Sequence, residues 1–383
     1  MVTLQNAENA LKSVYLGAVT ELLNTKINPL LSRIEQTTAG VWGKEIRKAV
    51  SWGINGGIGA GDETGDLPAA QSTDYYQFVT TLKNLYGQIE ISDKAIRASA
   101  DGRGAFTDLL NQELTNLLEA SRFNLGRMLY GDGTGKLSGI GASTSTGIYP
   151  VTDVQNLIEG LVVDVYGVTG TLISASLRIK SIDRDNKTVS FYTTPSITDG
   201  SSMYVQGSKD KEITGLGAIF GTGTLYGVPR TNKFMNPVTK SNAGLLDETV
   251  MQEMIDKLDT EANSTVDFIA VSADVKLAYQ EYMLQYKRNV DIMELAGGFR
   301  SMSYNGIPVV YDRFVGAGTM YLLNTSAFKL HQLCDWKYLE TENGKILRQT
   351  QGKPTYSATL VKYCDLMCDR PNGQACITGI TRS

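Results

Sequence analysis

Hydrophobic residues recur at helical spacing in four parts of the chain. The clearest pattern runs from Ala105 to Tyr130, where a broad apolar face stops at Gly131, and it predicts a helix roughly 39 Å long. Residues 3 to about 36 repeat the pattern, with Pro29 expected to break or kink the helix. A terminal arm with one apolar stripe must dock on the body or on a neighbour. Two shorter helices are predicted at 245–258 and 273–287.

Two predicted strands, 44–50 and 75–82, flank a glycine-rich run at 53–61 and indicate a long two-stranded arm with a mobile tip. An isolated hairpin is only marginally stable in water, so an arm of this length indicates an outside surface on which it lies. The alternative is a wide loop folded over its own domain. The candidate arm-tip residues are Gly53, Gly56, Gly57, Gly59 and Gly61.

Between Tyr149 and Lys211 the pattern becomes entirely β. Four short strands within about 60 residues indicate a small barrel or sandwich inserted into the host fold. The four strands are expected at 161–165, 172–180, 188–192 and 203–205. Further strands are predicted at 266–272, 320–324, 356–363 and 374–380, and a hairpin turned at Asn305-Gly306 is predicted over 299–311.

Composition narrows the class of protein. The 383 residues include 36 Lys plus Arg against 40 Asp plus Glu, for a net charge of −4, which argues against a basic face that grips nucleic acid. No stretch approaches the roughly 20 consecutive apolar residues of a membrane span. The opening residues lack the plan of a signal peptide, so a cytosolic history is the default expectation.

The sequence contains few residues arranged for catalysis. The single histidine, His331, has no Gly-x-Ser-x-Gly elbow near it, so it does not indicate a triad. The run 131–138 contains a Gly-Lys pair but has Tyr130 where a phosphate loop needs its first glycine. The four cysteines all follow His331 and lack metal-ligand spacing. We therefore predict no enzyme activity, no catalytic residue, no cofactor and no metal site.

The order of these parts resembles a known family. The specific matches are Gln88–Ala95 before the long helix, Gly131–Gly135 after it, Asn305–Val310, and the closing strand Arg370–Ile380. Together they resemble the major capsid protein of tailed bacteriophages, which has the α+β Hong Kong 97 fold. That resemblance implies peripheral and axial domains, an extended β-hairpin arm, an N-terminal helical arm and an inserted small β domain.

The resemblance also implies domain boundaries and a function. The expected parts are an N-terminal helical arm at 1–40, an extended loop arm at 41–90, a peripheral domain with the spine helix at 91–149, an inserted β domain at 150–211, a return to the peripheral domain at 212–244, an axial domain at 245–325 and peripheral C-terminal strands at 326–383. Such a chain assembles as pentamers and hexamers into an icosahedral shell in the bacterial cytoplasm. The shell encloses double-stranded DNA without reading its sequence. Its partners would be a portal and a scaffold, protease or decoration protein.

Some members of this family join subunits by Lys–Asn isopeptide bonds, and the candidates here are Lys44, Lys48 and Asn372. No local motif supports such a crosslink, and solvated surface residues are the simpler interpretation. Two alternatives to the capsid remain open. One is an encapsulin-like compartment with the same fold, which holds cargo enzymes; the other is a soluble enzyme or β-rich binding protein with a glycine-rich lid.

Overall fold

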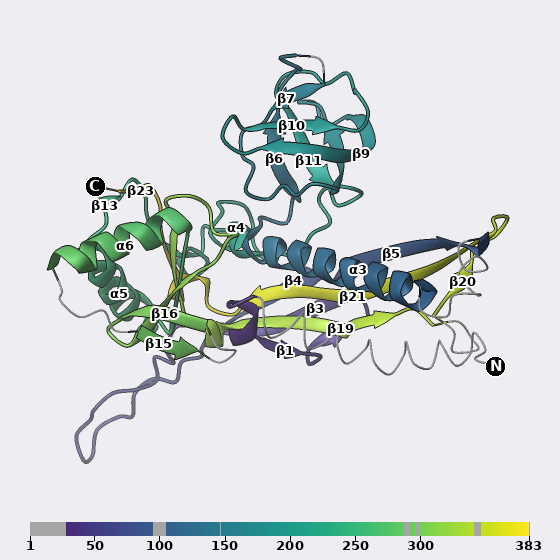
Figure 1. Cartoon of the computed structure of the whole chain (residues 1–383). Helices are drawn as coiled ribbons and strands as arrows, with labels where there is room; N and C mark the ends of the chain where they lie inside the picture. Colours follow the sequence, from purple (N-terminus) through teal and green to yellow (C-terminus); the bar gives the residue numbers. More distant parts are fainter. Residues whose placement is uncertain are drawn as a thin grey trace.

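The protein is elongated and is built around three separate apolar cores. The structure, a computed structural model, describes residues 28–94, 105–145, 147–286, 292–295, 299–340 and 346–382. A long sheet with one helix along it forms the middle, a second helix-and-sheet unit lies at one end, and a compact β unit stands apart from both (Figure 1). Residues 1–27, most of the predicted N-terminal helical arm, lie outside the described residues.

The long sheet and the spine helix share the first core. The helix is α3 (Ala105–Tyr130), with the bounds that the hydrophobic pattern predicts. It packs on β5 (Lys83–Ser92), where Leu85, Ile89 and Ile91 are buried at alternate positions. Gly87 allows the close approach, since a Cβ there would lie 2.9 Å from Leu117 Cδ1. The other strands of the sheet are β1 (Glu35–Thr37), β19 (Phe328–Tyr338), β20 (Arg348–Gln349) and β21 (Thr355–Cys368).

The described end of the predicted N-terminal arm is not an α-helix. After Pro29 the chain makes a single 3₁₀ turn, Leu31–Arg33, and then enters β1. β1 runs parallel to β19 through three residue pairs, from Glu35 opposite Lys329 to Thr37 opposite His331. The prediction of a helix to about residue 36 is therefore wrong for residues 28–36. Pro29 interrupts the helix, and the chain beyond it pairs with β19 at the edge of the long sheet.

The second core lies between a seven-stranded sheet and two helices, α5 (Glu248–Ala262) and α6 (Ala273–Tyr286). Asp247 caps α5 by accepting a hydrogen bond from the Val250 amide at 2.8 Å. The predicted turn at Asn305-Gly306 is confirmed, with φ of 49° and 78° at these residues. In spatial order the strands are β12 (Val238–Lys240), β22 (Ala375–Ile377), β18 (Met320–Leu323), β14 (Phe268–Val271), β17 (Ile307–Tyr311), β16 (Phe299–Tyr304) and β15 (Ile292–Leu295).

The tail of the chain divides between two sheets. β21 belongs to the long sheet, whereas β22 pairs with β18 and β12 in the seven-stranded sheet. The placement of all of 326–383 among peripheral strands therefore needs correction at β22. The 3₁₀ turn Pro371–Gly373 redirects the chain between the sheets, and the last strand, β23 (Ile380–Thr381), pairs with β13 (Gly244–Leu245).

The compact β unit has a core of its own and a closed sheet. All four strands predicted for it are present, and β6 and β7 join them, so the unit begins at Lys136 rather than at residue 150. A bridge between Ile140 and Val151 connects the two ends of the strand order and closes the barrel. In spatial order its strands are β6 (Lys136–Ile140), β11 (Ser201–Val205), β8 (Val162–Tyr166), β9 (Leu172–Asp183), β10 (Thr188–Phe191) and β7 (Ile148–Pro150).

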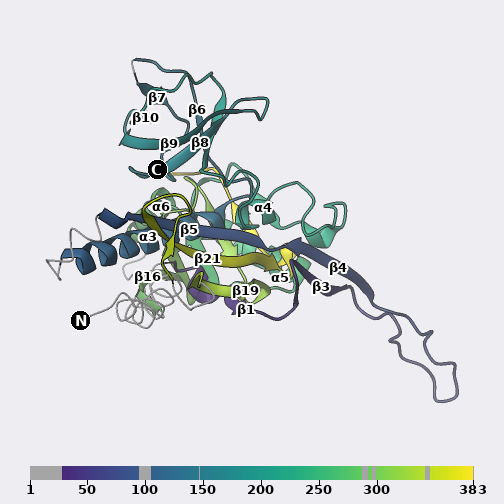
Figure 2. The ribbon, with the colours of Figure 1, turned by 90° about the vertical axis from the view of Figure 1, so that its right-hand side faces the viewer.

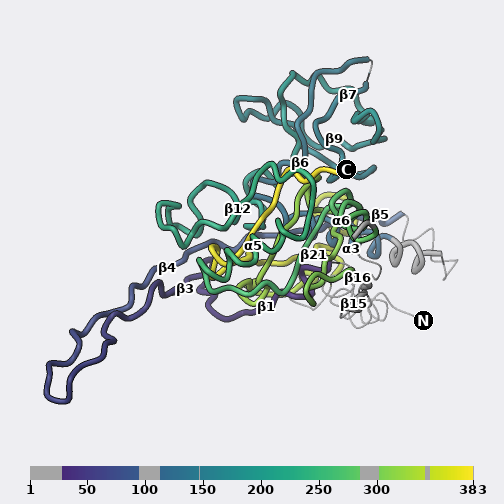
Figure 3. Tube along the Cα trace, turned by 90° about the vertical axis from the view of Figure 1, so that its left-hand side faces the viewer, coloured from purple at the N-terminus to yellow at the C-terminus, as the bar shows by residue number. Residues whose placement is uncertain are grey.

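A small three-stranded sheet gives rise to a long projection. It consists of β2 (Val41–Trp42), β3 (Glu45–Trp52) and β4 (Asp74–Thr81), and β3 pairs with β4 along its whole length. The chain between β3 and β4, residues 53–73, leaves the body as a long narrow loop (Figures 2 and 3). The predicted two-stranded arm is therefore present, and the alternative of a loop folded over its own domain is excluded.

Candidate functional site

The projecting arm, defined here as residues 53–73, is exposed almost throughout. Only Gly57 and Thr73 are half-buried, and every other residue of the arm is exposed. Ile54, Ile58 and Leu67 are 78%, 72% and 91% exposed, although large aliphatic side chains are usually covered in a folded chain. The arm therefore leaves all of its large aliphatic side chains uncovered.

The predicted arm-tip glycines follow one limb of the arm rather than its end. The end is the turn Asp62–Gly65, where the Gly65 amide donates to the Asp62 carbonyl at 3.2 Å. A Cβ on Gly59 would lie 3.1 Å from Pro68 Cγ, and one on Gly61 would lie 3.7 Å from the Asp66 carbonyl. Gly56 and Gly57 lie opposite Gln71 in the same way. These glycines let the two limbs run close together.

Positive φ is confined to one of the five candidate glycines. Gly53, which directly follows β3, has φ of +82°, a conformation that favours glycine. The conformational freedom expected of the whole glycine-rich run is therefore required only at Gly53. This residue lies at the root of the arm, which is the hairpin formed by β3 and β4. The root is where a change in backbone direction would alter the angle at which the arm leaves the body.

The arm and its root are acidic. Between Ala49 and Leu82 the sequence contains four acidic residues and no Lys, Arg or His. Three of them, Asp62, Glu63 and Asp66, are exposed at the end of the arm. A surface that receives this end should therefore be neutral or basic, because like charges would repel it.

Aromatic side chains brace the root of the arm against the body. The Phe234 ring lies 5.0 Å from the Trp52 ring and 4.7 Å from the Tyr76 ring, measured between centroids. Phe78 lies 5.6 Å from Tyr226, whose carbonyl accepts the Val79 amide at 3.0 Å. The root is thereby fixed by its own chain, while the arm beyond it is free of such contacts among the described residues.

A polar layer lies between the arm root and the long sheet. Asp365, fully buried, accepts hydrogen bonds from Thr80 Oγ1 at 2.6 Å and from the Thr214 amide at 2.7 Å. Burial raises the pKa of Asp365, although these donors favour the carboxylate. Lys48 forms an ion pair with Asp369 in the same layer. Four side chains from three segments thus hold the arm root in register.

Solved structures of viral shells share this architecture. The capsid asymmetric unit of cyanophage A-1(L) superimposes with a TM-score of 0.56 at 15% identity, over 93% of this chain and 94% of that chain. The chain has the Hong Kong 97-type capsid fold. The holo-SrpI encapsulin complex of Synechococcus elongatus (TM-score 0.48, 11% identity, 95% of each chain) and Mycobacterium phage Bobi (0.48, 9%, 99% and 98%) are also similar. No protein-family model and no curated protein sequence matches the chain.

Two of the three candidate crosslinking residues, Lys44 and Lys48, make contacts within their own chain. Lys48 is paired with Asp369, and Asn372 follows Asp369 by three positions in the sequence. Lys44 is exposed before β3, and its carbonyl accepts the Leu82 amide at 2.9 Å. Because the Lys48 ammonium is engaged by a carboxylate of its own chain, a bond from Lys48 to a neighbour would first require that pair to break.

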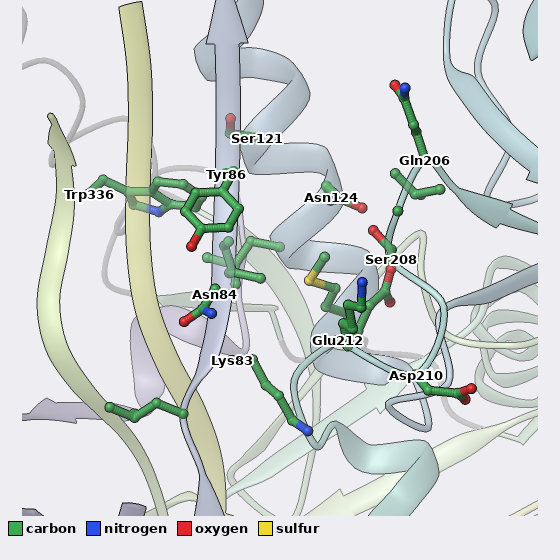
Figure 4. A pocket seen from close by; sticks show the side chains of 17 residues that line it. Lys83, Asn84, Tyr86, Ser121, Asn124, Gln206, Ser208, Asp210, Glu212 and Trp336 are labelled. Carbon is green, nitrogen blue, oxygen red and sulfur yellow. The ribbon is translucent and has the colours of Figure 1, made fainter. Parts of the chain in front are cut away.

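A pocket that the sequence did not indicate lies beside the spine helix. Its volume is about 590 Å³, and its walls come from β5, α3, β19 and the chain that follows β11 (Figure 4). Its polar lining includes Lys83, Asn124, Asp210 and Glu212, and Glu212 is held in a buried ion pair with Arg127. The described residues around the pocket include no histidine or cysteine.

Within the described ranges, no group of three or more His, Cys, Asp or Glu side chains is arranged to hold a metal ion. None of the helices in those ranges is long and apolar enough to cross a membrane.

Proposed function

We propose that this chain is the major subunit of a self-assembling icosahedral shell that encloses the double-stranded DNA of a tailed phage. Pentamers and hexamers of the chain would form in the cytoplasm of the bacterial host and become the capsid of the virion. The observation that carries the proposal is the arm, because a single copy leaves its aliphatic side chains uncovered. The capsid fold supports the same conclusion.

The energetics of the arm favour a neighbouring copy as its partner. Covering Ile54, Ile58 and Leu67 fully would contribute roughly 1.5–3 kcal/mol for each side chain before the cost of ordering the arm. A projecting arm contacts a different patch on its neighbour, so the contact is heterologous and repeats around a ring. Many such contacts of moderate strength hold a closed shell together while single misplaced subunits can still leave.

The charge of the chain suits a container for DNA. The net charge is −4 and the end of the arm is acidic, so neither provides the dense positive charge by which proteins grip phosphates. DNA inside such a shell would be confined rather than bound at specific bases. We expect a portal at one vertex and a scaffold, protease or decoration protein as further partners.

A triple substitution in the arm tests this function. The variant Ile54→Ser/Ile58→Ser/Leu67→Ser should fold with an unchanged circular-dichroism melting curve, yet remain as free subunits or capsomers in sedimentation and electron microscopy. The matched control is Val168→Ser/Leu172→Ser/Ile173→Ser in the β barrel, where the side chains are 79%, 47% and 36% exposed. The wild-type chain and the control should both form shells.

Three results would contradict the proposal. They are a wild-type chain that stays monomeric in every condition, an arm variant that closes shells of normal size, and an arm variant that fails to fold. The contents of the particles distinguish a phage capsid from an encapsulin-like compartment. Nuclease-resistant DNA is expected in the capsid and protein cargo in the compartment.

A further inference from the structure

A short segment, called the strap here, leads from the first core to β2 and β3 at the root of the arm. The strap is residues 28–40, and it is anchored at its start by Leu30, Leu31 and Ile34, which are all buried. Nearer the arm the strap makes fewer backbone hydrogen bonds to the body, because β1 pairs with β19 over only three residues. The strap ends in the turn 38–40, which directly precedes β2 and bonds to β3 through the Arg47 amide and the Gly40 carbonyl, 3.4 Å apart. Movement of this turn would therefore loosen β2 and the start of β3, which form the inner edge of the arm root.

The only histidine of the chain lies under that turn. His331 is 4% exposed, and its Nδ1 lies 2.9 Å from the Ala39 carbonyl oxygen. A carbonyl can only accept, so Nδ1 carries the proton and donates it, and Nε2 of the neutral ring presents a lone pair. Nε2 is buried without a partner among the described residues. The ring therefore fits this position in its neutral form.

Charged groups on β19 and on the neighbouring β1, β3 and β21 segments surround His331. They are Lys329 on β19, Glu35 on β1, Lys48 on β3, Asp365 opposite it on β21, and Asp369 after β21. Lys329 is paired with Glu35 at 2.8 Å, Lys48 is paired with Asp369, and Asp365 accepts hydrogen bonds from Thr80 and Thr214. Asp369 favours a protonated ring, whereas the two lysines oppose it.

We propose that His331 is a proton-sensitive latch that holds the strap, and with it the inner edge of the arm root, against the long sheet. The neutral ring keeps the turn 38–40 closed over it. Once protonated, Nε2 becomes a buried N–H donor with no acceptor among the described residues. The ring must then move toward water, and that movement takes Nδ1 away from the Ala39 carbonyl. The thin β1 pairing then opens, while the aromatic brace at Phe234 stays in place.

The direction of the pH dependence follows from the environment. Burial lowers the pKa of His331 most, and Lys48 and Lys329 act in the same direction, against the Ala39 hydrogen bond and Asp369. The folded state thus binds the proton less readily than the unfolded chain does. The stabilising contribution of the neutral ring is complete above the ordinary histidine pKa of about 6.5 and is lost as the pH falls through the folded pKa.

Hydrogen exchange of the full-length free subunit tests the latch. Between about pH 8 and about pH 5, peptides covering residues 36–48 should lose protection several-fold after correction for the intrinsic exchange rate. In His331→Gln, whose amide can still donate to Ala39 but does not titrate, the protection should be equal at both pH values. Peptides from 162–180 in the β barrel serve as the internal control. Unchanged protection in the wild type, or an equal loss in His331→Gln, would overturn the proposal.

A pair of charge variants keeps the test decisive if His331→Gln folds poorly. Lys48→Met removes a like charge and frees Asp369, so the midpoint of the transition should move to higher pH. Asp369→Asn removes the favourable carboxylate, so the midpoint should move to lower pH. Shifts in the same direction, or no shift in either variant, would overturn the latch. Because the measurement uses free subunits, its result is independent of whether the chain builds a shell.

Discussion

Two parts of the molecule project from its body, and they differ in what they bury. The β barrel has a core of its own, in which Val163, Ile179 and Met203 are fully buried, and its sheet closes on itself. The arm buries nothing and carries Ile54 and Ile58 in the open. Projection alone thus does not indicate a partner. The indication comes from a segment with no apolar core of its own, whose large aliphatic side chains are all exposed, whereas the barrel exposes side chains such as Val168 but keeps a core beneath them.

The difference extends to how each part is attached. The barrel rejoins the body at Glu212, whose carboxylate is paired with Arg127 of the spine helix, both almost fully buried. It is also tied by Gln155, which donates to the Val315 carbonyl at 2.7 Å. The arm is braced only at its root. The barrel therefore holds one orientation, whereas the arm can adapt to different neighbours, as the proposed five-fold and six-fold surroundings would require.

The largest expected effect comes from breaking the attachment of the barrel. Glu212→Gln leaves the Arg127 guanidinium buried without its counter-charge, and removal of one partner of a buried pair typically costs about 3–5 kcal/mol. Urea denaturation of the free subunit measures the loss. The matched control is Glu281→Gln, whose partner Arg382 is exposed and which should change stability little. Equal effects of the two substitutions would show that the barrel does not depend on this junction.

Truncating one isoleucine to alanine in each projection compares how much each side chain contributes to stability. Ile179→Ala in the barrel core should lower the free energy of unfolding by about 2–5 kcal/mol, because the deleted side chain is fully buried. Ile58→Ala in the arm should change it by less than about 0.5 kcal/mol in the free subunit. Chemical denaturation of both variants decides the point. A large loss for Ile58→Ala would mean that the arm packs on its own body.

The smallest expected effect concerns the loop that receives Gln155. Asp312 lies in this loop and accepts the Tyr130 hydroxyl at 3.0 Å and the Phe314 amide at 3.1 Å. Burial raises the pKa of Asp312, so the folded chain binds this proton more readily than the unfolded chain. Its contribution to stability is complete below the ordinary Asp pKa and is lost as the pH rises through the folded pKa.

The measurement is the difference in unfolding free energy between the wild type and Asp312→Asn. As the pH is lowered from neutral, the wild type should gain stability relative to this variant, which cannot titrate at position 312. Groups elsewhere in the chain cancel in the difference. A difference that stays constant with pH, or that shrinks in acid, would contradict the assignment.

The sequence predicted those parts of the fold that depend on local pattern. The spine helix follows from the spacing of its leucines and the hairpin at Asn305-Gly306 from turn chemistry. The pairing of β22 with β18 was not predictable, because β-strand pairing is non-local and two sheets compete for the tail. The position of His331 depends on Ala39, which lies 292 residues away in the sequence. At the arm, Asp62–Gly65 already contained a turn signal that could have placed the tip correctly.

The central claim is that the arm finds its cover on another copy of the chain. Hydrogen exchange of peptides from residues 53–73 measures this in assembled particles and in free subunits of the same protein. The account predicts fast exchange in the free subunit and strong protection in the particle, with barrel peptides from 162–180 equally protected in both. Equally fast exchange of the arm in particles and in free subunits would contradict it.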